Sequence, residues 1–323
     1  MNRVDLDPLL QELEESLEGP AVTAIGGGHG LARTLEAVQR YASSISAIVG
    51  VADNGGSSGR LSPALDIPPP GDIRRAMLAL TPNPSLWREL FAYRFTEGDV
   101  KDHSLGNLIL AALTDLEDDF EVAIRTAELY LGAAGTVIPV ARRRLHLQAV
   151  VDGRLVDGQL AVARTRGDVS ELRLVPEDVP ANPRALDALA EADQIVIGPG
   201  SLYTSLIAPL LVPGVVDTIN AAGARLVYVC NLVTQDGETL GMDATDHLAA
   251  LTGLTGMRMP DAIVANETAP VVPPPVEAVR VDPTALAGLG VTLESCDLVD
   301  PAAPWPAHDP VPLGSVLGRL AVA

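Results

Sequence analysis

Aromatic side chains are scarce in this chain of 323 residues, since phenylalanine, tryptophan and tyrosine together supply 3% of it. The hydrophobic fraction is still 47%, so alanine, valine, leucine and isoleucine must form the core of one large or two ordinary domains. There are two cysteines, Cys230 and Cys296, and their spacing signals neither a zinc site nor a disulfide framework. This cysteine usage predicts a protein of the reducing cytoplasm.

Basic residues are few as well: the formal net charge is -20, and Lys101 is the sole lysine, so there is no P-loop lysine. The basic run Arg142-Arg143-Arg144 is too short to hold nucleic acid against that charge and predicts a solvated hairpin edge. No apolar stretch has the length of a membrane helix, and residues 1–20 predict an acidic helical segment rather than a secretory signal. We therefore expect no nucleic-acid partner and no membrane span.

Short apolar runs predict buried strands at residues 21–25, 45–51, 193–197, 225–230 and 262–265, with weaker patterns at 276–281 and 291–298. Helical spacing of apolar residues predicts helices at 31–41, 73–80, 86–95, 105–116, 122–131, 182–190 and 315–322. A long loop is expected at 52–71, followed by Asp72 as the N-cap of the next helix. This alternation favours an α/β, Rossmann-like fold, with a mainly parallel sheet and helices on both faces.

Residues 136–175 differ from the rest, because short β-like segments there are separated by the turn dipeptides Asp152-Gly153 and Asp157-Gly158. They predict an antiparallel β excursion inserted into the α/β frame. The expected organisation is an N-terminal segment, residues 1–20, followed by one Rossmann-like domain, residues 21–323, that contains the excursion.

Three glycine-rich runs stand where strands should end: Gly26-Gly27-Gly28-His29-Gly30, Asp53-Asn54-Gly55-Gly56-Ser57-Ser58-Gly59-Arg60 and Gly198-Pro199-Gly200-Ser201. Glycine lets backbone N–H groups approach an anion closely, and a helix that opens after the turn adds the positive end of its dipole. The carboxyl ends of parallel strands share one edge, so the three runs predict a single crevice for a phosphate-bearing ligand.

Each motif also has a competing interpretation. The first run lacks the third glycine of the dinucleotide fingerprint, which disfavours an NAD-dependent dehydrogenase. The second contains G-x-S-x-G but lacks the strand directly before it that a hydrolase elbow needs. Asp53 suits a ribose hydroxyl or a metal-bound phosphate, or it only caps a turn. His103 and Asn107 share one helical face, which is more often a structural than a catalytic arrangement.

Six segments in register resemble the signature motifs of the bacterial gluconeogenesis factor family called YvcK, which is related to the 2-phospho-L-lactate transferases of the CofD superfamily: residues 24–31, 51–61, 69–74, 103–108, 198–205 and 228–239. The resemblance runs from about residue 21 to about residue 270. It implies a Rossmann-like, cytoplasmic protein that binds UDP-sugars, notably UDP-N-acetylglucosamine. It also implies a regulator of amino-sugar supply needed for cell shape, wall synthesis and growth on gluconeogenic carbon.

The chain departs from the family pattern at three places. His29 stands where relatives commonly carry threonine, and Asn54 stands where many carry a second aspartate. Ala307 precedes His308-Asp309 where relatives often have a basic residue, so we expect Arg60 or Arg74 to supply a cation instead. The loss of a carboxylate at position 54 disfavours metal-dependent transfer.

The leading hypothesis is a nucleotide-sugar-binding regulator without a required cofactor, a metal site or a catalytic residue. We expect a protein partner in amino-sugar or wall synthesis and a homo-oligomer. The alternative is a transferase of phosphorus-containing groups in which Asp53 and Asp72 hold Mg²⁺. The candidate ligand-contact residues are Gly26, Gly27, Gly28, His29, Asp53, Asn54, Gly56, Ser57, Ser58, Arg60, Asp72, His103, Asn107, Gly198, Gly200, Ser201, Tyr203, Thr204, Asn231, Gln235 and Asn266.

Among these, the diphosphate is expected on the backbone amides of Gly27, Gly28 and Gly200. Hydroxyl groups of Ser57, Ser201 and Thr204 are expected to add hydrogen bonds, with Ser201 as a helix cap. Asp53 is assigned to ribose or sugar hydroxyls, and Asn231 and Asn266 to amide or nucleobase edges.

Overall fold

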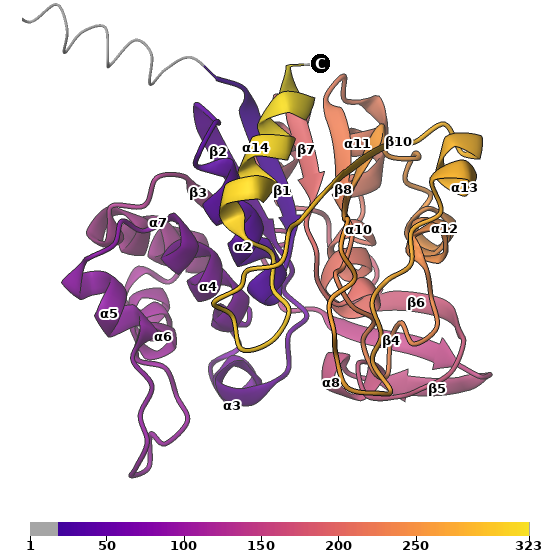
Figure 1. Ribbon diagram of the computed structural model, residues 1–323. Coiled ribbons are helices and arrows are strands. Elements are labelled where there is room, and N and C mark those ends of the chain that lie inside the picture. The colour runs from indigo at the N-terminus through magenta and orange to yellow at the C-terminus, as the bar shows by residue number, and fades with distance from the viewer. Residues whose placement is uncertain (1–18, 323) are drawn as a thin grey trace, which may run out of the picture.

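A computed structural model describes residues 19–322, so all but the last two residues of the predicted N-terminal segment lie outside the described part. Seven strands form one sheet in the order β10-β9-β8-β7-β1-β2-β3, and all neighbours are parallel (Figure 1). The strands are β1 (Ala21–Gly26), β2 (Ser44–Val49), β3 (Thr136–Pro139), β7 (Gln194–Ile197), β8 (Arg225–Val229), β9 (Ala262–Asn266) and β10 (Thr292–Cys296). This order is that of the doubly wound Rossmann fold with one added strand, which confirms the predicted fold class.

Helices cover both faces because side chains along each buried strand alternate between two apolar clusters. Ala24 points into one cluster and Ile25 into the other. The first cluster contains α2 (Gly28–Val38), α4 (Pro70–Leu80), α5 (Leu86–Ala92), α6 (Leu105–Glu117), α7 (Phe120–Leu131) and α14 (Pro310–Ala321). The second contains α9 (Pro183–Ala190), η1 (Leu202–Ile207), α10 (Ala208–Leu210), α11 (Val215–Ala221), α12 (Ala244–Thr255) and α13 (Pro283–Gly288).

A separate antiparallel sheet, ordered β5-β4-β6, lies below α10 and α12 in Figure 1, and its apolar side chains belong to the second cluster. It consists of β4 (His146–Val151), β5 (Arg154–Asp157) and β6 (Val169–Val175), with the short helix α8 (Gln159–Val162) between β5 and β6. The β4–β5 turn is made by Asp152 and Gly153, whose φ angles of 47° and 74° match the type I′ turn that this dipeptide predicts. The excursion therefore exists, but residues 136–139 do not belong to it: they form β3, the edge of the main sheet.

Three other predicted elements are corrected. The expected loop at 52–71 contains helix α3 (Gly56–Leu65), whose start is marked by a bond from the Gly59 N–H to the Gly55 carbonyl. Residues 276–281 form no strand, only one bridge between Val233 and Ala278. Helix α14 begins at Pro310, before the predicted start, because the Asp309 carboxylate caps it by accepting from the Val311 N–H.

Within residues 19–322, no single helix is long and apolar enough to cross a membrane. The segments Leu202–Leu210 and Val215–Ala221 meet that criterion only as a pair, across a 75° bend.

The start of α2 lies directly against the turn after β7. These two elements follow neighbouring parallel strands, β1 and β7. A Cβ placed on Gly30 would overlap the Pro199 carbonyl oxygen, and would lie 2.5 Å from the Pro199 carbonyl carbon and 3.1 Å from the Gly200 nitrogen. All three atoms belong to the backbone, so no side-chain rotation relieves the overlap, and glycine is required at position 30.

Substitution Gly30→Ala should therefore lower the free energy of unfolding by about 3 kcal/mol, because the two turns must move apart. The matched control is Gly253→Ala on the exposed face of α12, where a new Cβ meets nothing within 4 Å. That variant should be neutral or more stable by about 0.5–1 kcal/mol. Urea denaturation followed by circular dichroism measures both, and equal midpoints for the two variants would contradict the packing constraint.

Candidate functional site

The three glycine-rich runs lie together at the carboxyl ends of the parallel strands. The order of the strands reverses there, between the neighbouring strands β1 and β7. Gly30 contacts Pro199, which joins the first and third runs. Asp53 of the second run lies with Gly27 and Asp72 around one small pocket. Ligands of doubly wound sheets bind at this reversal of strand order, so the convergence expected from the sequence is present in the fold.

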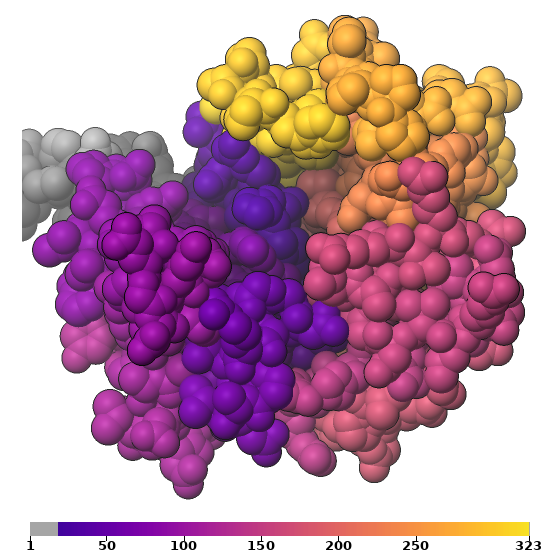
Figure 2. Space-filling view, turned by 90° about the horizontal axis from the view of Figure 1, so that it is seen from below, coloured from indigo at the N-terminus to yellow at the C-terminus, as the bar shows by residue number. Residues whose placement is uncertain are grey.

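A cleft of about 730 Å³ opens beside the first and third runs. Figure 2 shows a hollow where the indigo-to-violet, pink and orange-to-yellow parts of the chain meet. This volume is in the range of small-molecule sites. The cleft is lined by Gly27, Gly28, His29, Gly30, Arg33, Pro199, Gly200, Ser201, Ser205, Asn231, Leu232, Val233, Thr234, Gln235, Asp236, Val276, Ala303, Pro304, Trp305, Pro306, Ala307 and His308.

Helix α2 presents its N-terminus to this cleft. Its N-cap is Gly27, and no side chain caps the helix. The first-turn N–H groups of Gly28 and His29 precede the first intrahelical bond, in which Leu31 donates to Gly27. Partial burial and the Arg75 charge lower the pKa of His29, which keeps its imidazole neutral. The result is an uncapped, electropositive helix end at the cleft wall.

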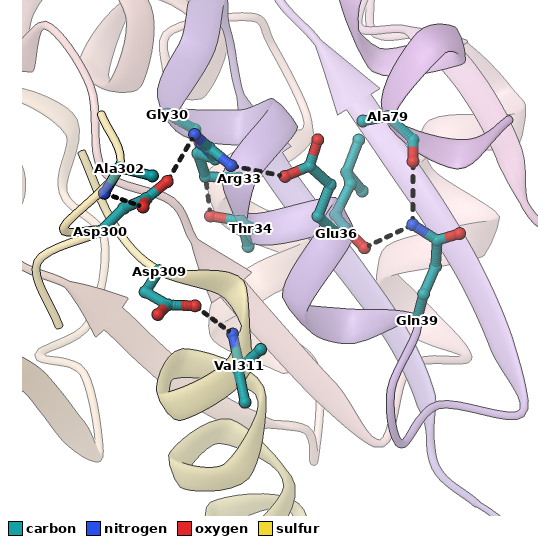
Figure 3. Close-up of polar contacts among 11 residues, drawn as sticks. Gly30, Arg33, Thr34, Glu36, Gln39, Ala79, Asp300, Ala302, Asp309 and Val311 are labelled. Atoms are coloured by element: carbon teal, nitrogen blue, oxygen red, sulfur yellow. Dashed lines mark hydrogen bonds and ion pairs between the residues drawn. The ribbon is translucent and has the colours of Figure 1, made fainter. Parts of the chain in front are cut away.

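Arg33, one turn along α2, is the sole arginine among the described lining residues. Its guanidinium lies between two carboxylates, donating to Glu36 at 3.1 Å and to Asp300 at 3.0 Å (Figure 3). Arg60 and Arg74, the cations expected from the sequence, are not part of this lining. The position of Arg33 on the predicted helix could have marked it as a candidate cation. Nothing in the sequence indicated that the loop of Asp300 lies beside it.

Asp53 and Asp72 form a carboxylate pair behind Gly27. Burial, and then the Asp72 charge, raise the pKa of Asp53, although its oxygen accepts from the Gly55 N–H at 2.9 Å. Asp72 is not an N-cap as expected: α4 starts at Pro70, and Asp72 lies in its first turn, paired with Arg75. No role was predicted for Arg75 from the sequence. Within residues 19–322, no group of three or more His, Cys, Asp or Glu is arranged to hold a metal ion.

Three other candidates form a buried network outside the cleft lining, and a fourth, Ser58, is bonded separately. Ser57 Oγ is hydrogen-bonded to His103 Nδ1 at 2.9 Å and accepts from Asn107 Nδ2 at 3.1 Å. Arg74 Nε donates to Asn107 Oδ1 at 2.9 Å, and burial lowers the pKa of Arg74 to about 10. Ser58 Oγ accepts from the Gly71 N–H. This network joins α3 to α4 and α6, so Ser57 is not available as the expected ligand hydroxyl.

Arg60 and Asn54 are also engaged elsewhere. Arg60 donates to the Lys101 carbonyl at 2.8 Å, which directs it toward the 98–103 loop. Asn54 Oδ1 accepts from the Leu160 N–H at 2.9 Å and so joins the second run to α8. Gly56 is the first residue of α3.

The third run departs most from its expected role, because a carboxylate of the chain occupies the start of η1. Glu238 accepts from the Tyr203 N–H at 2.9 Å and from Thr204 Oγ1 at 2.7 Å. Ser201 does not cap the helix but donates to Gln235 Oε1 at 2.8 Å. Tyr203 and Thr204 are therefore not free to hold a diphosphate.

Both asparagines at strand ends are bonded to backbone. Asn231 lines the cleft, but its amide accepts from the Gly200 N–H and donates to the Gly200 carbonyl, both at 2.8 Å. The Gly200 amide assigned to the diphosphate is thus already used. Asn266 accepts from the Leu298 N–H at 2.7 Å and donates to the Thr268 carbonyl. It lies outside the cleft lining. The remaining candidates, Gly26 and Gly198, are buried at the ends of β1 and β7.

Comparison with known proteins gives one consistent family. Residues 22–298 match the model described as 2-phospho-L-lactate transferase CofD. A gluconeogenesis factor from Bacillus subtilis is 43% identical over 249 residues, covering 76% of this chain and 78% of that protein. A putative gluconeogenesis factor from Mycobacterium tuberculosis is 40% identical over 309 residues, covering 92% and 89%. One from a Nostoc species is 42% identical, and this chain spans 56% of its length.

A solved structure agrees with these sequence matches. The crystal structure of a member of the UPF0052 family from Bacillus halodurans has a TM-score of 0.88 and 38% identity, covering 93% of this chain and 99% of that one. The strand order, the cleft at its reversal and the match over residues 22–298 show that the chain belongs to the CofD family and, within it, is similar to the gluconeogenesis factors.

Proposed function

We propose that this chain is a cytoplasmic regulator that binds a nucleotide sugar, UDP-N-acetylglucosamine, in the 730 Å³ cleft. The observation that carries the proposal is the uncapped N-terminus of α2 opening into that cleft with Arg33 one turn away. Backbone N–H groups and a guanidinium together are the partners that a diphosphate prefers. Relatives named gluconeogenesis factors support a role in gluconeogenic growth. Control of wall-precursor supply and cell shape, through a protein partner and a homo-oligomer, belongs to the same proposal.

The ligand would use the two sides of the cleft differently. The diphosphate would lie on the N–H groups at Gly28 and His29, with Arg33 exchanging a carboxylate partner for phosphate oxygens. Sugar hydroxyls would face the wall formed by Thr234, Gln235 and Asp236, whose side chains donate and accept hydrogen bonds.

Substitution Arg33→Gln should weaken UDP-N-acetylglucosamine binding by about 10- to 100-fold, since a hydrogen bond to a charged group contributes about 1.5–3 kcal/mol. The matched control is Glu36→Gln, which removes one of the two ion pairs of Arg33 but keeps the guanidinium. Isothermal titration calorimetry measures both, and the control should bind at least as tightly as the unaltered protein, because one competing carboxylate is gone. Equal affinities for all three proteins would remove Arg33 from the site, and no heat with the unaltered protein would reject nucleotide-sugar binding.

A second candidate function is transfer of a phosphorus-containing group, and the Asp53–Asp72 pair beside Gly27 favours it. Carboxylate oxygens are the ligands of Mg²⁺, which completes its coordination with water and substrate phosphates. Asp53 and Asp72 would hold the ion, which would neutralise charge developing on a transferred phosphoryl group. Asn54 would take no part, because its amide oxygen already accepts from Leu160.

Asp53→Asn separates the two functions. If the chain is a transferase, product formed from nucleotide diphosphate donors, Mg²⁺ and acceptor alcohols should fall by at least about 100-fold in this variant. If the chain is a regulator, no turnover is expected in either protein, and UDP-N-acetylglucosamine should still raise the Tm of both. Phosphorus-31 NMR of the reaction mixture detects turnover directly, and turnover that survives Asp53→Asn would exclude Asp53 as a metal ligand.

A further inference from the structure

The loop between β10 and α14 forms one wall of the cleft and is fastened at its base. Val299 and His308 form an antiparallel bridge. The Asp300 N–H donates to the Ala307 carbonyl at 2.8 Å, and the Asp309 N–H donates to the Leu298 carbonyl at 2.7 Å. In Figure 1 this loop is the gold segment that leads into α14. Its tip, residues 301–306, is thus held at both ends.

The base of this loop is also tied to α2. The Asp300 carboxylate accepts from Arg33 at 3.0 Å and from the Ala302 N–H at 2.9 Å (Figure 3). Because Arg33 also faces the proposed diphosphate position, the loop is fixed next to the site where the phosphates would lie.

Trp305 stands at the tip, with Pro304 before it and Pro306 after it. Its side chain lines the cleft, yet 48% of the residue is exposed to solvent. The prolines fix their own φ angles and restrict Trp305 to extended backbone. The backbone that carries the indole therefore has little conformational entropy left to lose on binding.

The two walls of the cleft differ in polarity. Residues 303–307 read Ala-Pro-Trp-Pro-Ala, so the indole N–H is their only polar side-chain group. The segment after β8 contributes Thr234, Gln235 and Asp236 to the same cleft. A sugar ring needs hydrogen-bond partners for its hydroxyls, whereas a nucleobase offers a flat π face. The apolar wall therefore suits the base, and the polar wall suits the sugar.

We propose that Trp305 is the stacking platform for the nucleobase of the bound nucleotide, and that the Arg33–Asp300 ion pair positions its loop. This inference rests on nucleotide binding in the cleft. It assigns the base to one wall and gives Trp305 a direct contact with the ligand. Stacking on an aromatic side chain is tolerant of base identity, so the platform supplies affinity rather than strict selection among bases.

The test compares four proteins with three ligands by calorimetry. Trp305→Ala should weaken both UDP and UDP-N-acetylglucosamine by about 10-fold, and Trp305→Phe should retain most of the affinity, since stacking of one base contributes a factor of this size. N-acetylglucosamine-1-phosphate has no base, so its affinity should be the same for the unaltered protein and both variants. The matched control is Trp87→Ala, which removes an exposed tryptophan on α5 that packs against Tyr130. It should bind all three ligands normally.

Each contrary result has one meaning. Equal UDP affinity in Trp305→Ala and the unaltered protein would overturn the platform and leave nucleotide binding intact. An equal loss for N-acetylglucosamine-1-phosphate would show that Trp305 stacks on the sugar, which also overturns the assignment. Failure of the unaltered protein to bind UDP or UDP-N-acetylglucosamine would reject the proposed function and the platform together.

Tryptophan fluorescence distinguishes direct contact with the base from a purely structural role of Trp305, because a structural role would not change the emission when UDP binds. In a Trp87→Phe background, Trp305 is the single tryptophan. Saturating UDP should quench or shift its emission, because the base would cover the exposed face of the indole, and N-acetylglucosamine-1-phosphate should not. Unchanged emission at a UDP concentration that calorimetry shows to be saturating would contradict the proposal.

Discussion

Direct backbone contact between the start of α2 and the turn after β7 is the constraint on which the site depends. Gly30 has no Cβ, so the Pro199 carbonyl can lie against it. The β1–β7 pairing joins the two halves of the sheet, and the Gly30–Pro199 contact then sets how closely the two turns beyond these strands approach each other. It leaves the N-terminus of α2 uncapped and facing outward, and it places the Asn231 loop opposite, where its amide binds both backbone groups of Gly200. The cleft is thus a consequence of two turns packed without side chains between them.

The net charge of -20 reflects an excess of carboxylates, and several of them lie at this edge of the sheet. Carboxylates of the chain already hold three positions that could attract an anion: Glu238 at the start of η1, Asp72 on Arg75 and Asp300 on Arg33. Glu238 is buried, so displacing it would leave a charge without its partners. At the start of α2, Asp72 lies beside Gly27, but no carboxylate of residues 19–322 accepts a hydrogen bond from the Gly28 or His29 N–H. An anionic ligand is therefore directed to α2, with Arg33 within reach once its carboxylate partners give way.

The sequence predicted the strands and glycine turns well, because both signals are local. Apolar runs such as 193–197 and dipeptides such as Asp152-Gly153 act within a few residues. Prediction from the sequence failed where a residue's hydrogen-bond or strand partner lies far away along the chain. Thr204 was assigned to phosphate because nothing local reveals that Glu238, 34 residues later, accepts its hydroxyl. The segment 136–139 was assigned to the excursion because a short β pattern does not say which sheet it joins. Trp305 was overlooked for the same reason: its loop meets α2 across more than 260 positions of chain.

Asn54 shows how a departure from a family pattern can be misjudged without a fold. The amide was expected to weaken a metal site by removing a charge next to Asp53. In the structure its oxygen accepts from the Leu160 N–H, and its nitrogen fills the space that a Cβ on Gly158 would occupy. A carboxylate oxygen at position 54 could accept the same bond, so either residue would fasten the antiparallel sheet to the second glycine run. The replacement therefore says nothing against a divalent cation. Any metal chemistry in this chain depends on Asp53 and Asp72, whose carboxylates remain beside the open end of α2.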